Sequence, residues 1–344
     1  MKNKLKHLVP VLLALATITG SLSACELKPK AQQKVSKQGF YFDTIIQITL
    51  YGTTDEKYID DCFDMAKKYE DMLSNTVSYS EVSKINDAAG KEYVTVSDDT
   101  LELIKNGIEY GDTSDGRFDI TIGKLSDLWN FSEIAENTDS KDNEVDASVV
   151  PSDAQIQSEL SHVNYRNIQI NGNDVMLTDS KAKLDLGGIA KGFIADKMKT
   201  YLQSKKITSG IINLGGNVLT VGEKSDRSDY TVGIQKPFDE SGEPICTVKV
   251  KDKSVVTSGI YERYYRVDGK LYHHILDTTT GYPVKNNLYS VTIISDSSCN
   301  GDALSTTCFA LGIDKAKELI NSLSGVEAIF VTDDYSIITT SDDV

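Results

Sequence analysis

Asp302 and Thr306 are the residues of this sequence best suited to hold a metal ion. They lie four apart in the segment GDALSTTCFALG, which is predicted to form a largely apolar helix, so both oxygens fall on one helical face. We place Asp302 in the first turn, where a carboxylate also stabilises the helix dipole without any ligand. A carboxylate and a hydroxyl are hard oxygen ligands for Mg²⁺, which keeps room for substrate phosphates. Both roles stay open at this point.

The segment LDLGGIAKGFIAD, residues 184–196, could bind an anion. We expect a buried strand to end at 184–186, the pair Gly187 and Gly188 to turn the chain, and a helix to run over 189–203. Glycines allow a ligand close to the backbone, and N–H groups at a helix start, together with Lys191, attract negative charge. The segment matches neither standard nucleotide-binding motif. Taken alone, the segment is more simply explained by a tight turn followed by a solvated lysine, because glycine is a general turn former.

A second diglycine and a pair of histidines are further candidates. Gly215 and Gly216 interrupt a predicted strand over 211–218, and two such strand ends could approach one ligand. His273 and His274 lie in a predicted strand over 272–277. Neighbouring strand residues point to opposite faces, so at most one of them should face a given site. With a pKa near ~6.5, a histidine can act as a base, although a single histidine in a strand is usually structural.

The elements that must position these residues are a mixture of helices and strands. Residues 230–234 and 246–250 read as antiparallel strands, and 168–177 as a hairpin. Ser97 is predicted to cap a helix over 98–113. Further strands are expected at 40–51, 254–260, 288–294, 326–331 and 337–340, and further helices at 55–73, 80–86, 151–161 and 314–323.

The composition of the 344 residues is that of a folded globular protein, with 40% hydrophobic and 25% charged residues. The net charge of −15 argues against nucleic acid as a partner. Four cysteines follow residue 25, none in a metal-binding spacing, and we expect Cys62 and Cys308 to lie in the core.

The first 24 residues are predicted to be a signal peptide, with three lysines before a short apolar stretch. The sequence LSAC that ends at Cys25 resembles a bacterial lipobox, so we expect a lipid on Cys25. An ordinary secretory signal is the alternative. Residues 25–39 are polar and are predicted to be a flexible tether, with the folded domain over 40–344.

Four motifs occur in the order found in one family: LDLGGIAKGFIAD, NLGGNV, HHILDTTTGYPV and GDALSTTCFALG. With the segments FYFDTIIQITLYG and DGRFDITIGKLSDLWNF, they make the chain resemble the FAD:protein FMN transferase (ApbE) family from about residue 40 to the C-terminus. The resemblance implies a single α+β domain of mixed and antiparallel sheets with packed helices, a T-fold-like core and a helical insertion. Lipoproteins are common in that family, in agreement with Cys25.

The resemblance also implies a reaction. FMN would pass from FAD to a threonine or serine hydroxyl of an extracytoplasmic flavoprotein, with release of AMP and with Mg²⁺ as cofactor, at a cell membrane that the protein contacts only by its lipid anchor. Carried over to this sequence, the metal ligands would be Gly188, Asp302 and Thr306, and the base would be His274. The positions that would contact FAD are Phe42, Phe118, Asp119, Ile120, Asp185, Gly187, Lys191, Gly216, His274 and Ile275.

Two departures from the family pattern stand out. Thr278 replaces the proline that usually follows the motif H-I-x-D, and we expect a less rigid loop there. Phe42 stands where methionine is frequent. Two other functions remain open, an FAD pyrophosphatase that releases FMN and AMP, and a lipoprotein that binds flavin without turnover.

Overall fold

An eight-stranded antiparallel sheet organises the chain, with strand order β1-β2-β6-β7-β10-β13-β14-β15. The computed structural model describes residues 33–136, 138, 143–224, 226–239 and 241–341. The strands of this sheet are β1 (Lys34–Tyr41), β2 (Thr44–Tyr51), β6 (Ser209–Leu214), β7 (Asn217–Gly222), β10 (Ser254–Gly259), β13 (Leu288–Ser295), β14 (Glu327–Thr332) and β15 (Ile337–Thr339).

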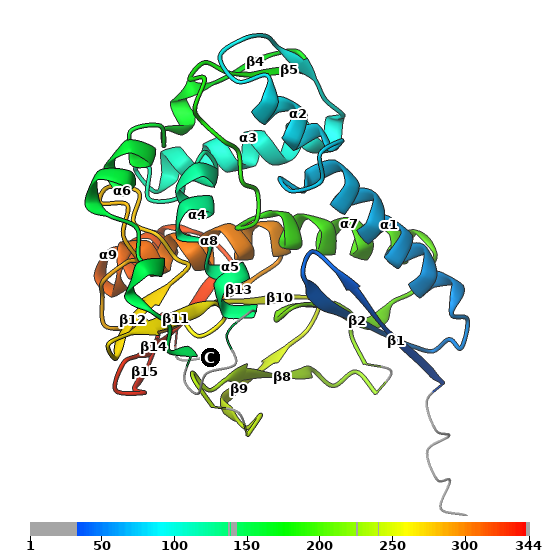
Figure 1. The fold of residues 1–344 in the computed structure, drawn as a ribbon. Helices are drawn as coiled ribbons and strands as arrows, with labels where there is room; N and C mark the ends of the chain where they lie inside the picture. Colours follow the sequence, from blue (N-terminus) through cyan, green and yellow to red (C-terminus); the bar gives the residue numbers. More distant parts are fainter. Residues whose placement is uncertain (1–32, 137, 139–142, 225, 240, 342–344) are drawn as a thin grey trace, which may run out of the picture. The chain divides into compact units, whose positions relative to one another are not determined.

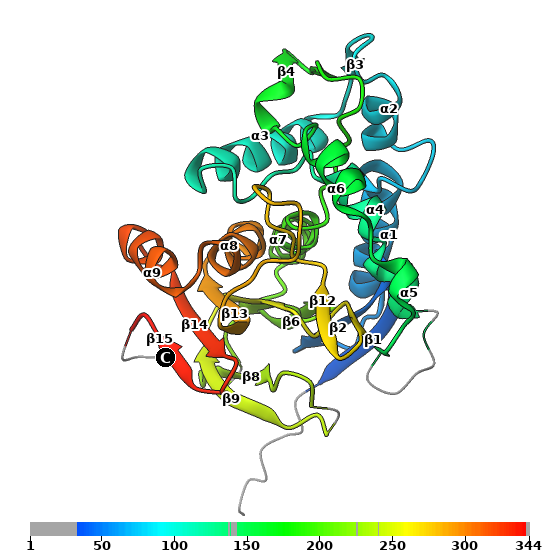
Figure 2. The ribbon, with the colours of Figure 1, turned by 60° about the vertical axis from the view of Figure 1, so that its left-hand side comes forward.

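Helices cover one face of this sheet, and a hairpin covers the other (Figures 1 and 2). The alternation of side chains along a strand divides the apolar residues between the two faces. Val291 and Ile293 of β13 pack toward the helices, whereas Ile294 packs toward the hairpin. The helices are α1 (Lys57–Leu73), α7 (Ala190–Ser204), α8 (Ser298–Leu311) and α9 (Ile313–Ser322), and the hairpin is β8 (Tyr230–Gln235) with β9 (Pro244–Val250).

A helical insertion lies between α1 and α7 in the sequence. It contains α2 (Glu81–Asp87), α3 (Asp98–Thr113), α4 (Gly123–Trp129), α5 (Phe131–Glu136), α6 (Asp153–Leu160), 3₁₀ turns at Ala147–Val149 and Tyr165–Asn167, and a small sheet of β3 (Val94–Thr95), β5 (Asp174–Leu177) and β4 (Ile168–Asn171). Trp129 is fully buried in an aromatic cluster with residues of the hairpin β11 (Tyr264–Val267) and β12 (Lys270–His273). The expected α+β class, single domain and helical insertion are confirmed.

Helices α7 and α8 cross in direct backbone contact at Gly192. A Cβ atom at this position would lie 2.1 Å from the carbonyl oxygen of Ser298, so no other residue fits without displacing a helix. Asp196 of α7 accepts hydrogen bonds from the N–H groups of Ser298 and Cys299, both at 2.9 Å, at the start of α8. In return, Asp302 of α8 accepts a 2.9 Å bond from the N–H of Gly192 in the first turn of α7. Each helix thus provides a carboxylate for free N–H groups of the other.

Several local predictions were correct. Ser97 caps α3 by accepting from the N–H of Thr100 at 3.3 Å, and the hairpins β4–β5 and β8–β9 form as expected. Cys62 and Cys308 are buried free thiols. Within the described residues, none of the helices has the length and apolar character that a membrane crossing requires.

The N-terminal boundary of the domain was wrong. Strand β1 begins at Lys34, so residues 34–39, predicted as part of the tether, pair with β2. The single strand expected over 40–51 is a hairpin that turns at Phe42 and Asp43, with φ of 53° and 54°. Residues 1–32, with the predicted signal peptide, Cys25 and most of the tether, lie outside the described residues.

Three further expectations differ from the structure. Residues 184–186 do not form a strand, and the nearest ladder contact is an isolated bridge between Ile122 and Lys183. Gly215 and Gly216 form the turn between β6 and β7 instead of interrupting one strand. Asp302 lies in the second turn of α8, because Ser297 caps this helix and its first residue is Ser298.

We predict that Gly192→Ala lowers the free energy of unfolding by about 1–3 kcal/mol, the usual cost of overpacking. The added methyl group would collide with the backbone of α8, which has no rotamer to change. Urea unfolding followed by circular dichroism measures the loss. Gln203→Ala, at an exposed position of the same helix, is the control and should stay within about 0.5 kcal/mol of the unmodified protein. Equal stability of both variants would show that the crossing tolerates a side chain.

Candidate active site

The ammonium group of Lys191 links the diglycine turn to α8. Its Nζ donates to the carbonyl oxygen of Gly187 at 3.2 Å and lies 3.9 Å from Oδ1 of Asp302. The side chain of Lys191 is 30% exposed and that of Asp302 is 6% exposed, so the pair is only partly shielded from solvent. A cation therefore already lies between a backbone oxygen and a carboxylate oxygen in the free protein.

The two carboxylate oxygens of Asp302 have different tasks. Oδ2 accepts from the N–H of Gly192, whereas Oδ1 has no hydrogen bond within the described residues and faces Lys191. Thr306, one turn further along α8, is half-buried, and its Oγ1 lies 3.1 Å from Oγ of Ser258. Asp302 thus lies at the N-terminal end of α7, beside Lys191, and Thr306 follows it by one turn of α8.

This oxygen set suits a hard cation better than a transition metal. The described residues contain no cluster of three or more His, Cys, Asp or Glu side chains able to hold a metal. A site at Asp302 and Thr306 would use one carboxylate with neutral oxygens, which is a ligand set that Mg²⁺ accepts because it retains waters and binds substrate phosphates. The carbonyl that faces Lys191 belongs to Gly187, while Gly188 packs near the ring of Phe118.

Polar contacts hold the segment before α7 in place of the expected strand. The side chain of Asn86 binds both the N–H and the carbonyl of Leu184, at 2.7 and 3.1 Å. Asp185 donates its N–H to the carbonyl of Ile120 at 2.8 Å, and its Oδ1 accepts from the N–H of Gly187 at 2.8 Å. The diglycine turn is therefore fixed by the insertion on one side and by α8 on the other.

His274 is held in one tautomer. Its Nδ1 lies 3.2 Å from the carbonyl oxygen of Arg263, which can only accept, so Nδ1 carries the proton and Nε2 keeps a free lone pair. Burial among protein atoms, then the charge of Arg263, lowers the pKa of His274 to about 3. The ordinary pKa expected from the sequence is therefore wrong for the free protein, and the ring is neutral at neutral pH.

His273 serves the fold. The ring is buried, lies 3.0 Å from the carbonyl oxygen of Val284, and accepts from the N–H of Ile275 at 3.3 Å. Burial lowers its pKa to about 4. The side chain of Ile275, a predicted FAD contact, belongs to the hydrophobic core as well.

Glu262 is a titratable residue of this site that the sequence did not reveal. Its side chain is exposed, yet desolvation by the surrounding protein raises its pKa to about 7. The positive charges of Lys191 and Arg263 oppose this rise, and the negative charge of Asp302 adds to it. Water therefore reaches part of the Glu262 side chain, while protein atoms surround most of its carboxyl group.

The predicted flavin contacts in the insertion are mainly structural. Asp119 is buried and accepts three hydrogen bonds, from the N–H and the hydroxyl of Thr121 at 2.8 and 2.6 Å and from the N–H of Tyr165 at 2.8 Å. Burial raises its pKa against the effect of these bonds. Ile120 is 1% exposed. Their backbone N–H groups have no partner in the described part of the chain, so these are the groups left for a ligand.

The remaining predicted contacts lie in turns. Phe42 is half-buried, and its N–H donates to Oε1 of Glu70 at 2.8 Å. The N–H of Gly216 donates to Oδ1 of Asn213 at 2.9 Å. Gly215 packs against Thr44 of the first hairpin, whereas Gly188 packs against Phe118 of the insertion, so the contacts that we observe do not join the two diglycines at one point.

Two bonds join the insertion to the segment that follows His274. Arg117 Nη1 lies 2.9 Å from Oδ1 of Asp277, and the hydroxyl of Thr278 donates to the carbonyl of Gly116 at 2.7 Å. Proline at position 278 could not make the second bond. The threonine thus provides an attachment of its own in the loop for which we expected less rigidity.

Sequence reasoning also missed the supporting residues Gly192, Asp196, Ser258 and Arg263. Gly192 and Asp196 lie four apart on one helical face, the same spacing as Asp302 and Thr306, and this was the one available signal. Arg263 acts through its backbone carbonyl, which no side-chain pattern can reveal.

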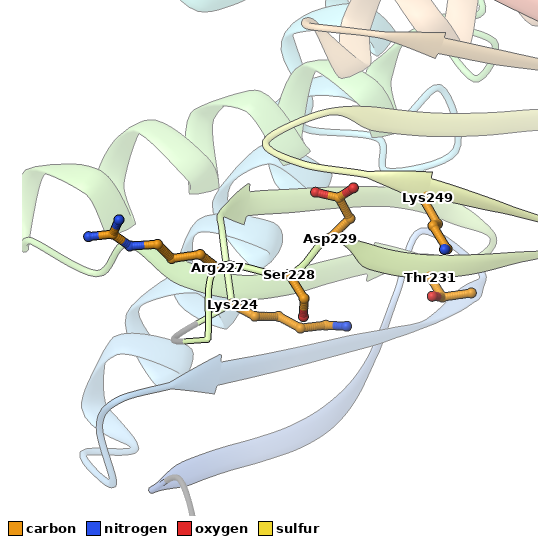
Figure 3. Close-up of a pocket in the computed structure, with 6 residues that line it drawn as sticks. All are labelled: Lys224, Arg227, Ser228, Asp229, Thr231 and Lys249. Atoms are coloured by element: carbon orange, nitrogen blue, oxygen red, sulfur yellow. The ribbon is translucent and has the colours of Figure 1, made fainter. Parts of the chain in front are cut away.

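Two open pockets contain none of the predicted site residues. A cavity of about 410 Å³ near β8 and β9 is lined by Lys224, Arg227, Ser228, Asp229, Thr231 and Lys249 (Figure 3). Arg227 extends away from the other five side chains (Figure 3). The second, of about 270 Å³, includes Asn86, Lys124 and Lys183 behind the segment that precedes α7.

Sequence comparisons with known proteins all indicate the same family. The sequence profile of the ApbE family matches residues 42–330. An FAD:protein FMN transferase of Klebsiella pneumoniae (strain 342) is 37% identical over 298 residues, which cover 86% of this chain and 88% of that protein. One of Treponema pallidum (strain Nichols) is 32% identical over 294 residues, covering 81% and 78%.

Solved structures agree with the sequence relatives. The crystal structure of the ApbE protein of Thermotoga maritima has a TM-score of 0.79 at 31% identity and covers 89% of this chain and 96% of its own. The flavin transferase ApbE of Vibrio cholerae has a TM-score of 0.77 and covers 90% of this chain and 96% of its own. At 24% identity, this match supports the fold alone.

We predict that the free energy of unfolding of the unmodified protein falls relative to that of Glu262→Gln as the pH rises from 4 to 8. The unfolded carboxyl group loses its proton near its ordinary value of 4.5 and the folded one only near 7, so the folded state binds more protons between these values. Stability conferred by this residue is therefore present below pH 4.5 and is lost toward pH 7. Urea unfolding midpoints at pH 4, 6 and 8 test this. Glu109→Gln, at an exposed position of α3, is the control. A pH-independent difference for Glu262→Gln would contradict it.

Proposed function

The chain belongs to the ApbE family, and from this we propose that it transfers FMN from FAD to a threonine or serine hydroxyl of a flavoprotein. A P–O bond of the FAD diphosphate breaks, a phosphoester to the acceptor oxygen forms, and AMP leaves. The hydroxyl proton passes to a base. The observation that carries the proposal is the position of Asp302 at the crossing of α7 and α8, 3.9 Å from Lys191 and one helical turn before Thr306.

The start of α7 supports binding of the diphosphate. This helix has no side-chain cap of its own at its first residues. The N–H groups of Gly188 and Lys191 have no hydrogen-bond partner among the residues that the structure describes. Free N–H groups at a helix start and an ammonium group 3.2 Å from the same turn favour an anion with concentrated charge.

We place Mg²⁺ at Asp302 Oδ1 and Thr306 Oγ1, with a backbone carbonyl of the diglycine turn as a further ligand, Gly188 by family resemblance. The residues fit this ion because Oδ1 of a buried carboxylate has no hydrogen bond to any residue that the structure describes, and a hydroxyl stands one helical turn away. When bound, Mg²⁺ would neutralise charge that develops on phosphate oxygens. Lys191 would then be free to turn toward the phosphates.

His274 is suited to accept the proton of the acceptor hydroxyl at Nε2, because Nδ1 is already protonated and bound to the Arg263 carbonyl. A pKa of about 3 makes the ring neutral but weakly basic in the free protein. Burial is the largest cause of this low pKa, and the positive charges of Arg263 and Lys191 add to it. A bound diphosphate would offset the two positive charges and raise the pKa of His274 above its value in the free protein, which would make the ring a better general base.

Mixing the full-length protein with FAD, Mg²⁺ and a threonine-containing flavoprotein tests the function directly. Transfer predicts an acceptor heavier by FMN less water, with one AMP released per modified acceptor. Free FMN and AMP with an unmodified acceptor would identify a pyrophosphatase. Intact FAD that stays bound would identify a flavin-binding protein. Mass spectrometry of the acceptor and chromatography of the nucleotides distinguish the three results.

We predict that His274→Ala retains FAD binding and slows transfer by roughly 10²–10⁴-fold, the scale of losing a general base. Single-turnover transfer at saturating FAD gives the rate, and flavin fluorescence gives the affinity. His162→Ala is the control, because that histidine pairs with Asp179 at 2.7 Å in the insertion and should leave the rate unchanged. Transfer at the unmodified rate by His274→Ala would remove this residue from the mechanism.

We propose further that the protein is a lipoprotein on the extracytoplasmic face of the cell membrane. The support is the signal-like segment with Cys25. Cys25→Ala should then move the protein from the membrane fraction to the soluble fraction, as measured by immunoblot of fractionated cells. Retention in the membrane fraction would contradict a lipid anchor at this cysteine.

A further inference from the structure

Three hydroxyl groups connect β10 to the proposed metal ligands on α8. Ser258 Oγ lies 2.7 Å from Ser305 Oγ and 3.1 Å from Thr306 Oγ1. Ser305 Oγ in turn lies 2.9 Å from the backbone carbonyl of Asp302. The chain therefore begins at one proposed ligand and ends at the backbone of the other.

The protons of this chain can run in only one direction if all three contacts are hydrogen bonds. A carbonyl oxygen can only accept, so Ser305 donates its single proton to Asp302. Ser258 must then donate to Ser305, and Thr306 must donate to Ser258. The proton of Thr306 therefore points to β10, and its oxygen lone pairs point elsewhere.

This direction matters because a metal ion needs the lone pairs. A threonine in a helix often donates to the carbonyl four residues earlier, which for Thr306 is that of Asp302. Here that proton is bound by Ser258 instead. Ser258 pairs with Val291 of β13 in the large sheet, so its backbone is positioned independently of α8.

We propose that Ser258 is a positioning residue, which directs the Thr306 proton toward β10 and thereby presents the Thr306 oxygen to a divalent cation at Asp302. The inference rests on the proposed metal site. Hydrogen-bond partners outside the ligand set commonly hold metal ligands in one orientation, and losing one costs about 10–100-fold in metal affinity. Ser258 need not touch the ion to have this effect.

Mn²⁺, a spin-active ion with the same oxygen preference as Mg²⁺, is the probe. We titrate the full-length protein and follow free Mn²⁺ by electron paramagnetic resonance. Ser258→Ala should raise the dissociation constant roughly 10–100-fold, and Ser258→Thr, which keeps the hydroxyl, should restore tight binding. Ser254→Ala is the matched control on the same strand, because the Ser254 hydroxyl is buried and has no hydrogen-bond partner in the described part of the chain.

A second measurement separates positioning from chemistry. The Mg²⁺ concentration for half-maximal flavin transfer should rise in Ser258→Ala by the same factor, while the rate at saturating Mg²⁺ stays near that of the unmodified protein. Ser305→Ala keeps the contact between Ser258 and Thr306 but removes the acceptor of the Ser258 proton. The Mn²⁺ affinity of this variant should therefore lie between those of the unmodified protein and Ser258→Ala. Unchanged affinity in Ser305→Ala would overturn the fixed direction.

Asp302→Asn distinguishes failure of this inference from failure of the function. Asparagine still offers an oxygen to the N–H of Gly192 but lacks the charge, so Mn²⁺ binding should be lost. If Asp302→Asn loses Mn²⁺ and Ser258→Ala binds it as the unmodified protein does, Ser258 has no such role and the proposed function stands. If Asp302→Asn binds Mn²⁺ normally, the metal site itself is wrong and the inference falls with it.

Discussion

The exchange of carboxylates between α7 and α8 is the constraint on which the site depends. Asp196 and Asp302 each bind N–H groups at the start of the opposite helix, and Gly192 lets the two backbones touch between them. The start of a helix has several N–H groups without an internal partner, and a carboxylate there gains both a hydrogen bond and a favourable dipole. The same crossing fixes Lys191 and Asp302 relative to each other, so stability and the proposed chemistry rely on one contact.

A buried carboxylate must be compensated, and Asp302 is compensated in a way that leaves it usable. Its Oδ2 accepts from Gly192, and the charge of Lys191 stands 3.9 Å from Oδ1. That distance is longer than a hydrogen bond, so the ammonium balances the charge without occupying the oxygen. The protein is acidic as a whole, with a net charge of −15, yet Lys191 and Arg263 both lie close enough to Glu262 to act on its carboxyl group. The ammonium group of Lys191 gives an anionic ligand at the diglycine turn one charge opposite in sign to the net charge of the molecule.

The sequence predicted elements whose signals are local and missed those set by distant partners. The cap at Ser97 and the hairpin over 168–177 follow from neighbouring residues, and both formed. Strand β1 was missed because its lysines, serine and glutamine suggest a tether, although charged residues are typical of an edge strand, which β1 is. The bond between Gly192 and Asp302 joins residues 110 apart, a distance at which no pattern in one sequence indicates contact. The family motifs pointed to the proposed ligand residues, but not to the contacts that Ser258 and Asp196 make with α8.

Hydrogen bonds and an ion pair join motifs that lie far apart in the sequence. In the DGRF motif, Arg117 pairs with Asp277 of the segment after His274. The hydroxyl of Thr278 makes a second link by donating to the carbonyl of Gly116. In NLGGNV, Asn217 accepts from the Ser298 hydroxyl at 2.6 Å, at the start of α8. The proposed phosphate end of the site therefore rests on the large sheet and its helices, while the proposed flavin end rests on the insertion. A dinucleotide bound across both would need the two parts in register, and these cross-links provide it before any ligand arrives. Because binding then has little ordering entropy to overcome, more of the interaction energy remains for the reacting geometry.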